Sequence, residues 1–203
     1  AFIESELLAS LGVLSISAGM DLSESDLGTA KDAYRLNRFG VLGIIAKLYL
    51  NAEVYTGTPR WQEAHDAANH IINNGGYTLC GTGCSVPNPG KRPKVDTDPD
   101  LLEGFAAVFV PNNDGNPEHI WSVKYDAATG PGFNLAMMAL HYSSQLTWNF
   151  DAQPWNGYST LETFYNSFNG DPRQSSSFIE GPQLDFGGSA LLDYATDDGD
   201  PLL

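Results

Sequence analysis

Between Tyr34 and Gly57, apolar residues recur at spacings of three and four, and this pattern limits the possible folds more than any other in the chain. The stretch reads YRLNRFGVLGIIAKLYLNAEVYTG. Its apolar stripe consists of Phe39, Leu42, Ile45, Tyr49 and Ala52. Side chains at this spacing share one face of an α-helix and are buried against another element. Gly57 suits the position just past the end of a helix. The pattern therefore predicts a long buried helix over 34–57.

A second helix is predicted over 58–76, where the chain reads TPRWQEAHDAANHIINNGG. Thr58 suits its N-cap, Pro59 its first helical position and Gly75-Gly76 its end. The expected apolar face consists of Trp61, Ala64, Ala68, Ile71 and Ile72. Because the connection is short, the two helices should form an antiparallel hairpin. The small residues of the second helix follow the rhythm of a tetratricopeptide repeat, although only one pair is visible.

The rest of the chain is dominated by irregular segments. Residues 77–118 mix Pro, Gly and charged residues around one short apolar stretch, LLEGFAAVFV. Alternation in EHIWSVKYD predicts a strand over 118–126, and LETFYNSFNG predicts a helix that ends at Gly170. We therefore expect a mainly α fold with long irregular loops and little strand. Its organisation would be a single domain over 1–203, with a helix pair at 34–76, a loop-rich ligand-binding region at 77–173, and an acidic tail at 174–203 that is exposed or poorly ordered after 188.

Charge narrows the possible partners. The 203 residues include 10 Lys and Arg against 25 Asp and Glu, which gives a formal net charge of −15. Nucleic acids and anionic membrane surfaces are bound through clustered basic side chains, so neither is an expected partner. The sequence has no apolar run of the length that a transmembrane helix needs. The chain begins AFIESELLASLG without an initiator Met, and we expect it to be processed or excised material.

Two cysteines, Cys80 and Cys84, lie in the sequence CGTGC. Their spacing matches neither a zinc ribbon nor a thioredoxin-like motif. The glycines between them would allow a small disulfide ring to close, and two free thiols are the alternative. The acids in DTDPDLLEG suggest calcium at 96–100, but the Gly and Glu that an EF-hand loop needs are missing. We interpret 96–100 as a solvated acidic loop and 112–116, NNDGN, as a turn, and we expect neither a metal nor a cofactor.

Catalytic signatures are missing from the sequence. It contains no nucleophile elbow, zinc-protease helix, phosphate-binding loop or dinucleotide fingerprint, so none of these motifs indicates an enzymatic activity. One alternative is a glycoside hydrolase, which needs two carboxylates across a sugar bond; Glu162, Asp171 and Glu180 are candidates by residue type. Asp171-Pro172-Arg173 reads more simply as a turn with a local ion pair. Another alternative is a tetratricopeptide-type protein-interaction adaptor that uses a groove on the helix pair.

The segment WNFDAQPWNGY, residues 148–158, holds four aromatic residues in eleven positions. It lies within the 48 residues between Lys124 and Arg173, which contain ten aromatics and four acids but no Lys or Arg. Ring faces can stack on the C–H face of a sugar while neighbouring amides bond its hydroxyls. The candidate ligand-binding residues are Trp148, Trp155, Asn156 and Tyr158, and packing into a core is the alternative. Rings on predicted helical faces are assigned to the core: Phe39, Trp61, Phe164, Tyr165 and Phe168.

Several stretches together resemble the SusD/RagB-like outer-membrane nutrient-binding lipoproteins of the Bacteroidetes. In order, they are GIIAKLYLNAEVYTG, WQEAHDAANHIINNGGYTL, PEHIWSVKYD, and WNGY with FYNSFNGDPR. The first two resemble the central helix pair of the family. The third resembles its E-x-I-x-x-V element, here Glu118, Ile120 and Val123, and the last resembles a stretch that closes on Asp171 and Arg173. The resemblance covers residues 30–185.

This resemblance implies a non-enzymatic receptor exposed at the cell surface. Such proteins capture glycans, or in some members peptides, and cover a TonB-dependent SusC-like transporter in the outer membrane. The implied fold is an α-α superhelix of tetratricopeptide-like hairpins, in a longer protein with further helices before and after this region. The implied lipid anchor would lie outside the sequence printed here, because Cys80 is internal. The candidate ligand residues rest on the aromatic pattern and not on the resemblance.

Overall fold

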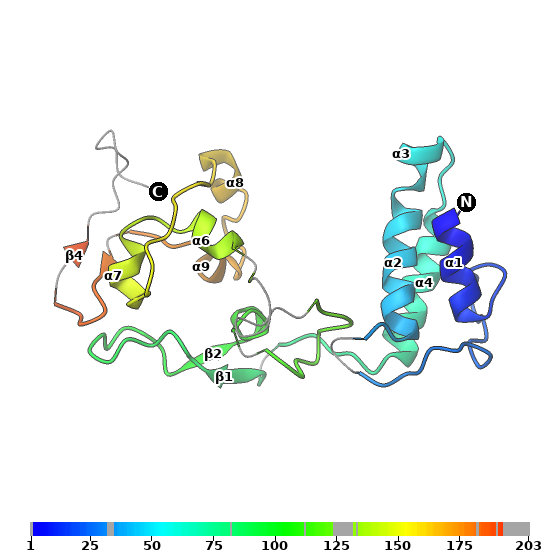
Figure 1. Ribbon diagram of the computed structural model, residues 1–203, viewed down its shortest axis with the longest axis horizontal. Helices are drawn as coiled ribbons and strands as arrows, with labels where there is room; N and C mark the ends of the chain where they lie inside the picture. Colours follow the sequence, from blue (N-terminus) through cyan, green and yellow to red (C-terminus); the bar gives the residue numbers. More distant parts are fainter. Residues whose placement is uncertain are drawn as a thin grey trace. The chain divides into compact units, whose positions relative to one another are not determined.

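The computed structural model describes residues 2–31, 35–81, 83–111, 113–123, 132, 134–181, 183–189 and 191–192. Helices make up 37% and strands 5% of it, so the fold is mainly α with little strand, as expected (Figure 1). Two compact units divide the chain. We call Ala1–Leu79 with Asp114–Lys124 the helical unit, and Cys80–Asn113 with Tyr125–Leu203 the loop-rich unit. A single domain over 1–203 stays a prediction, because two packing units can belong to one domain.

The described part of the helical unit contains four helices. They are α1 (Phe2–Leu11), α2 (Arg38–Leu50), α3 (Ala52–Thr56) and α4 (Trp61–Asn74). Helix α2 packs along α4 and also against α1 (Figure 1). All five residues of the predicted stripe, from Phe39 to Ala52, are buried, and the four that lie in α2 share one core cluster with Ala64, Ala67 and Ile71 of α4. Burying a large apolar side chain contributes about 1.5–3 kcal/mol, so this contact is the main source of stability in the unit.

The predicted helix over 34–57 begins later and is interrupted. Asn37 caps α2 by accepting a hydrogen bond from the backbone N–H of Gly40 at 2.8 Å, and Tyr34 lies outside the described residues. The helix ends at Asn51, whose side-chain amide donates to the Lys47 carbonyl at 2.9 Å. Such side-chain bonds compete with the helical backbone pattern, which explains the break between α2 and α3. Gly57 ends α3 in the left-handed conformation, as predicted.

The second predicted helix is confirmed over Trp61–Asn74, and Ala64 and Ile71 are buried as expected, but its start and two residues of its predicted face were wrong. Thr58 is not the N-cap: its N–H donates to Thr56 Oγ1 at 3.2 Å, and Arg60 precedes the helix. Trp61 is 57% exposed and Ile72 is 70% exposed, so neither belongs to the core. The buried face of α4 is centred on Ala67 and Ile71. Because each residue is rotated by about 100° around the helix axis from the one before it, the side chain of Ile72 points away from this face.

A polar cluster joins three helices of this unit. Tyr49 of α2 donates its hydroxyl hydrogen bond to Glu4 of α1 at 2.9 Å, and Arg60 before α4 pairs with the same carboxylate. Arg60 also donates to Glu63 at 2.9 Å, and its guanidinium carbon lies 3.9 Å from the centroid of the Tyr49 ring. Burial, with the hydrogen bond to Glu4, raises the pKa of Tyr49 to about 12. The bond from Arg60 lowers the pKa of Glu4 from its ordinary value of 4.5.

The strand predicted over 118–126 is wrong for 118–123, which contain no strand; residues 124–126 lie outside the described part. This stretch belongs to the helical unit. Thr78 donates to the Pro117 carbonyl at 3.2 Å, and Ile120 packs against the core while Val123 is exposed. The alternation therefore reflects one inward side chain, Ile120, and among the described residues no strand pairs with this segment.

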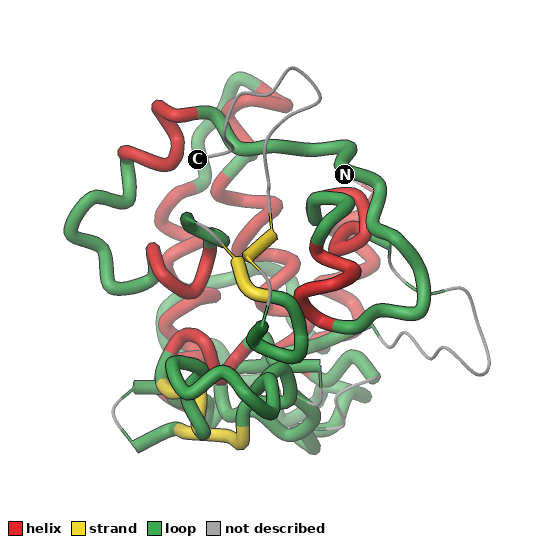
Figure 2. Tube along the Cα trace, turned by 90° about the vertical axis from the view of Figure 1, so that its left-hand side faces the viewer, coloured by secondary structure: helices red, strands yellow, loops and turns green. Residues whose placement is uncertain are grey.

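Most elements of the loop-rich unit are short, and Figure 2 shows loop between them. The helices are α5 (Phe105–Val108), α6 (Leu135–Ala139), α7 (Ser144–Trp148), α8 (Glu162–Asn166) and α9 (Gln174–Ser177). Two antiparallel strand pairs complete the unit: β1 (Ser85–Pro87) with β2 (Leu101–Glu103), and β3 (Gln183–Leu184) with β4 (Leu191–Leu192). Exposure or poor order was expected after 188. Ser189 is exposed, but Leu191–Leu192 forms β4, so the expectation of poor order is wrong there. Residues 190 and 193–203 lie outside the described residues.

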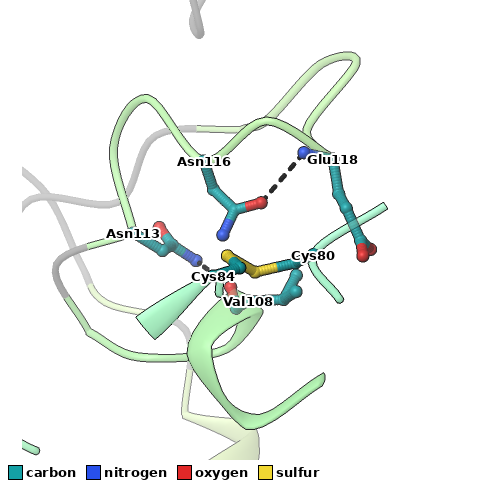
Figure 3. The surroundings of a disulfide bond; sticks show 6 residues. All are labelled: Cys80, Cys84, Val108, Asn113, Asn116 and Glu118. Atoms are coloured by element: carbon teal, nitrogen blue, oxygen red, sulfur yellow. Dashed lines mark hydrogen bonds between the residues drawn. A yellow bond between two sulfur atoms is a disulfide. The ribbon is translucent and has the colours of Figure 1, made fainter. Parts of the chain in front are cut away.

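A disulfide joins Cys80 and Cys84, which decides between the alternatives left by the sequence (Figure 3). Cys80, Ala107 and Val108 form a small buried cluster around it. Asn113 donates a hydrogen bond to the Val108 carbonyl at 3.2 Å and so closes the chain after α5 (Figure 3). A ring of this size contributes about 2 kcal/mol in the chain-entropy account. The stretch LLEGFAAVFV therefore contributes Ala107 and Val108 to a local core of the loop-rich unit, whereas Leu101, Phe105 and Phe109 are exposed.

The acidic loop after 95 is held by neighbouring basic residues. Arg92 makes a bidentate ion pair with Asp98, with distances of 2.8 and 2.7 Å, and Lys91 pairs with Asp100. Arg92 also donates to the Leu184 carbonyl at 3.0 Å, which connects this loop to β3. Among the described residues, no three His, Cys, Asp or Glu side chains form a group that could hold a metal ion. The charges of this loop balance each other locally.

Helix α8 is shorter than expected and its rings are only partly buried. It ends at Asn166, and the chain then turns through Gly170. Phe164, assigned to the core, is 55% exposed, whereas Tyr165 and Phe168 are half-buried. All three rings contact Phe178, with centroids 5.1 to 6.0 Å apart. They form a surface cluster because no long element covers this short helix.

The capping side chain of α2 generates one prediction. Besides accepting from Gly40, buried Asn37 donates to the Ala30 carbonyl at 3.1 Å and to the Tyr77 hydroxyl at 3.2 Å. Asn37→Ala should lower the free energy of unfolding by about 1–2 kcal/mol, because a cap is lost and buried partners are left unpaired. Urea unfolding measures this change. The exposed Asn73→Ala in α4 is the matched control; an equal loss in both variants would contradict the capping role.

Acid should weaken the helical unit through Glu4. The pKa of Glu4 is lower in the folded protein than its ordinary value of 4.5. Its ionised carboxylate therefore contributes its full stabilising free energy above pH 4.5, and this contribution is lost as the pH falls through the lower pKa of the folded state. The stability of the wild type should therefore fall between about pH 6 and pH 3, and Glu4→Gln should reduce that fall. Urea midpoints across this pH range test it. Glu6→Gln, on the exposed side of the same helix, should leave the slope unchanged.

Candidate functional site

The candidate ligand residues begin at the end of α7. Asn149 follows Trp148 in the left-handed conformation, with φ 53°, and the N–H of Phe150 donates to the Gln145 carbonyl at 3.1 Å. This pattern is a Schellman-type helix end, usually made by Gly. It turns the chain sharply, so that the rings of Trp148 and Phe150 stack with centroids 6.2 Å apart. Local backbone geometry thus sets the position of the first candidate ring.

The other three candidates lie on one segment that is bonded to α6. The N–H of Trp155 donates to the Met137 carbonyl at 2.7 Å, and that of Tyr158 donates to Met138 at 3.0 Å. Asn156 has φ 49° and donates its N–H to the Leu140 carbonyl at 3.1 Å. The carbonyls at the end of a helix lack partners within it, and here the aromatic segment supplies them. The segment is held along its backbone, which leaves its side chains free to face outward.

Two of the three candidate rings are too exposed to belong to a hydrophobic core. Trp155 is 51% exposed and Tyr158 is 53% exposed, whereas Pro154 beside them is fully buried. Trp148 is half-buried. The alternative of core packing therefore does not describe Trp155 and Tyr158. We call Trp155, Asn156 and Tyr158 the aromatic platform; ligand binding there stays a prediction.

A cavity of about 1010 Å³ lies within the loop-rich unit. Five of its lining side chains are aromatic: Phe105, Phe109, Trp148, Phe150 and Phe186. Its polar lining side chains are Asn88 and the three serines of α9, Ser175–Ser177. The described lining includes no Asp, Glu, Lys, Arg or His. Trp148 therefore lines this cavity, whereas the three residues of the aromatic platform are not among its described lining residues, so the structure divides the predicted site in two.

The carboxylates proposed for a glycosidase are engaged in local contacts. Asp171 is paired with Arg173, whose Nε lies 2.9 Å from Asp171 Oδ1; this bond and the positive charge lower the pKa of Asp171 to about 2. The predicted ion pair in this turn is confirmed. Partial desolvation and a hydrogen bond with Glu180 raise the pKa of Tyr165. Glu162 accepts from Asn166 at 3.5 Å on the exposed surface of α8. An ionised Asp171 is a poor proton donor near neutral pH, which makes it unsuited to act as a general acid.

Sequence reasoning missed most of the cavity. Phe105 and Phe109 lie four residues apart, a helical spacing that could have placed both rings on one side of α5. Their centroids are 4.8 Å apart. Phe186 and the serines of α9 carried no such signal, because they reach the cavity only through the path of the loops. Its wall near Trp148 also includes Gly90, where an added Cβ would lie 3.9 Å from the indole ring.

Comparisons with known proteins found no match, whether with protein-family models, with curated proteins or with solved structures. No described helix is both long enough and apolar enough to cross a membrane.

The turn after Trp148 generates the prediction for this site. Asn149→Gly should leave the free energy of unfolding within about 0.5 kcal/mol, because Gly adopts the left-handed conformation freely. Asn149→Val should cost roughly 1–2 kcal/mol, since a β-branched residue is strained there. Urea unfolding followed by tryptophan fluorescence measures both. In the control Asn169→Val the exposed residue has no positive φ, so the cost should be smaller; equal costs would argue against strain at Asn149.

Proposed function

We propose that this chain is part of a SusD/RagB-like receptor that binds neutral glycans at the cell surface. The observation that carries the proposal is the aromatic platform: Trp155 and Tyr158 are half exposed although their backbone is tied to α6 by hydrogen bonds. Rings that are exposed and held in place offer contact area at little entropic cost on binding. The segment around them has no Lys or Arg from 125 to 172, which favours an uncharged ligand.

The chemistry of the platform matches a sugar. The apolar C–H face of a pyranose can lie on an aromatic ring while its hydroxyls stay in water or bond to an amide. Asn156, half-buried between the two rings in sequence, has an amide that can both donate and accept. An open platform of this kind supports modest affinity, in the range from about −4 to −8 kcal/mol.

The proposed role is to capture the glycan and pass it to a TonB-dependent SusC-like transporter in the outer membrane. The packed pair of α2 and α4 supports this assignment as one tetratricopeptide-like hairpin of the α-α superhelix. Attachment to the membrane would use a lipid anchor outside residues 1–203. In this proposal the protein is a binding protein and not an enzyme, and it uses neither a metal nor a cofactor.

Titration with a panel of neutral oligosaccharides, followed by tryptophan fluorescence and calorimetry, tests the proposal. We expect saturable binding that Trp155→Ala weakens about five-fold or more, because one stacking ring contributes about 1 kcal/mol. Trp61→Ala is the matched control, since this Trp is exposed to a similar extent in the helical unit. Circular dichroism should show both variants folded.

Two outcomes would contradict the proposal. One is the absence of saturable binding across the panel, and the other is equal loss in Trp155→Ala and Trp61→Ala. Release of reducing ends that stops in Glu162→Gln or Glu180→Gln would instead establish the hydrolase alternative.

A further inference from the structure

The cavity of the loop-rich unit differs chemically from the aromatic platform. Its five rings are joined by Leu102, Val110 and Ile179, and its described lining bears no charged side chain. The amide of Asn88 is already used: its nitrogen donates to the Pro99 carbonyl at 3.0 Å, and its oxygen accepts from the Gly90 N–H at 2.9 Å. The remaining polar side chains are three exposed serines on α9. The cavity can therefore satisfy few hydrogen bonds.

This lining is a poor match for a sugar. Nearly every carbon of a hexose has a hydroxyl, and each hydroxyl that is buried without a partner costs roughly 1–3 kcal/mol. An aromatic ring has the opposite requirement, because it gains from contact with other rings and needs no hydrogen bond. A volume of about 1010 Å³ is at the upper end of the range for small-molecule pockets. The serines can still bond one polar group at the end of such a ligand.

We propose that this cavity binds an uncharged molecule or substituent that contains one or two aromatic ring systems, single or fused. The rings lie between the Trp148–Phe150 stack and the Phe105–Phe109 pair, and a terminal hydroxyl or ether oxygen meets the serines of α9. The described lining has no charged side chain. Arg173, whose guanidinium carbon lies 5.9 Å from the centroid of the Phe105 ring, is already paired with Asp171. This disfavours carboxylates and phosphates, because the lining would not compensate the desolvation of their charge. This site stands independently of glycan binding on the platform, since it uses different residues.

The test titrates the whole chain with N-phenyl-1-naphthylamine. This uncharged probe joins a phenyl and a naphthyl group and fluoresces in apolar surroundings. We expect saturable enhancement that Phe109→Ala weakens about five-fold, the factor that corresponds to the loss of one ring contact. Phe109 is 67% exposed, so its removal should not unfold the protein. Phe164→Ala is the matched control, because this exposed Phe lies in the same unit outside the described lining.

Competition identifies the source of the aromatic group. Phenyl β-glucoside and benzyl alcohol should both displace the probe, whereas methyl β-glucoside should not. Displacement by methyl β-glucoside would overturn the proposal, because the cavity would then accept a bare sugar. Equal weakening in Phe109→Ala and Phe164→Ala, or enhancement that never saturates, would overturn it as well. Trp155→Ala should leave probe binding unchanged even if glycan binding on the platform is lost, which separates this site from the proposed function.

Discussion

Burial of the apolar stripe of α2 is the contact on which the helical unit depends. Ile45 and Leu42 are fully buried between α4 and α1, and each contributes on the order of 2 kcal/mol by leaving water. Asn37 fixes where this helix begins, and the Glu4–Tyr49–Arg60 cluster joins its other end to the neighbouring helices. The polar groups therefore position the helices relative to one another, and the apolar groups supply most of the stabilising free energy.

The loop-rich unit is organised by different means. Its helices have four or five residues, too few to be stable alone, and its buried cluster around Cys80 is small. A disulfide and the bidentate pair of Arg92 with Asp98 take the place of a large core, and Arg92 also reaches the Leu184 carbonyl. These links hold loops in defined positions while leaving many rings uncovered, which is the property that a binding surface needs.

Two neighbouring surfaces of this unit have opposite hydrogen-bonding character. The platform around Trp155 is an exposed surface with an amide beside its rings, whereas the wall of the cavity beside Trp148 is mostly apolar and offers few hydrogen-bond partners. Leu140 connects them, because its side chain lines the cavity and its carbonyl accepts the N–H of Asn156. The aromatic platform and the cavity differ in the number of available hydrogen-bond partners and not in their aromatic character.

Features set by near neighbours in the chain were determined by the sequence itself. The buried face of α2, the end of α3 at Gly57 and the ion pair of Asp171 with Arg173 all depend on residues at most four positions apart along the chain, or on one conformational preference. The exposure of Trp61, the missing strand at 118–123 and the composition of the cavity were decided by the tertiary structure. These features depend on which distant segments of the chain come together. Apolar periodicity predicts that a side chain is buried, but it does not predict which segment covers it.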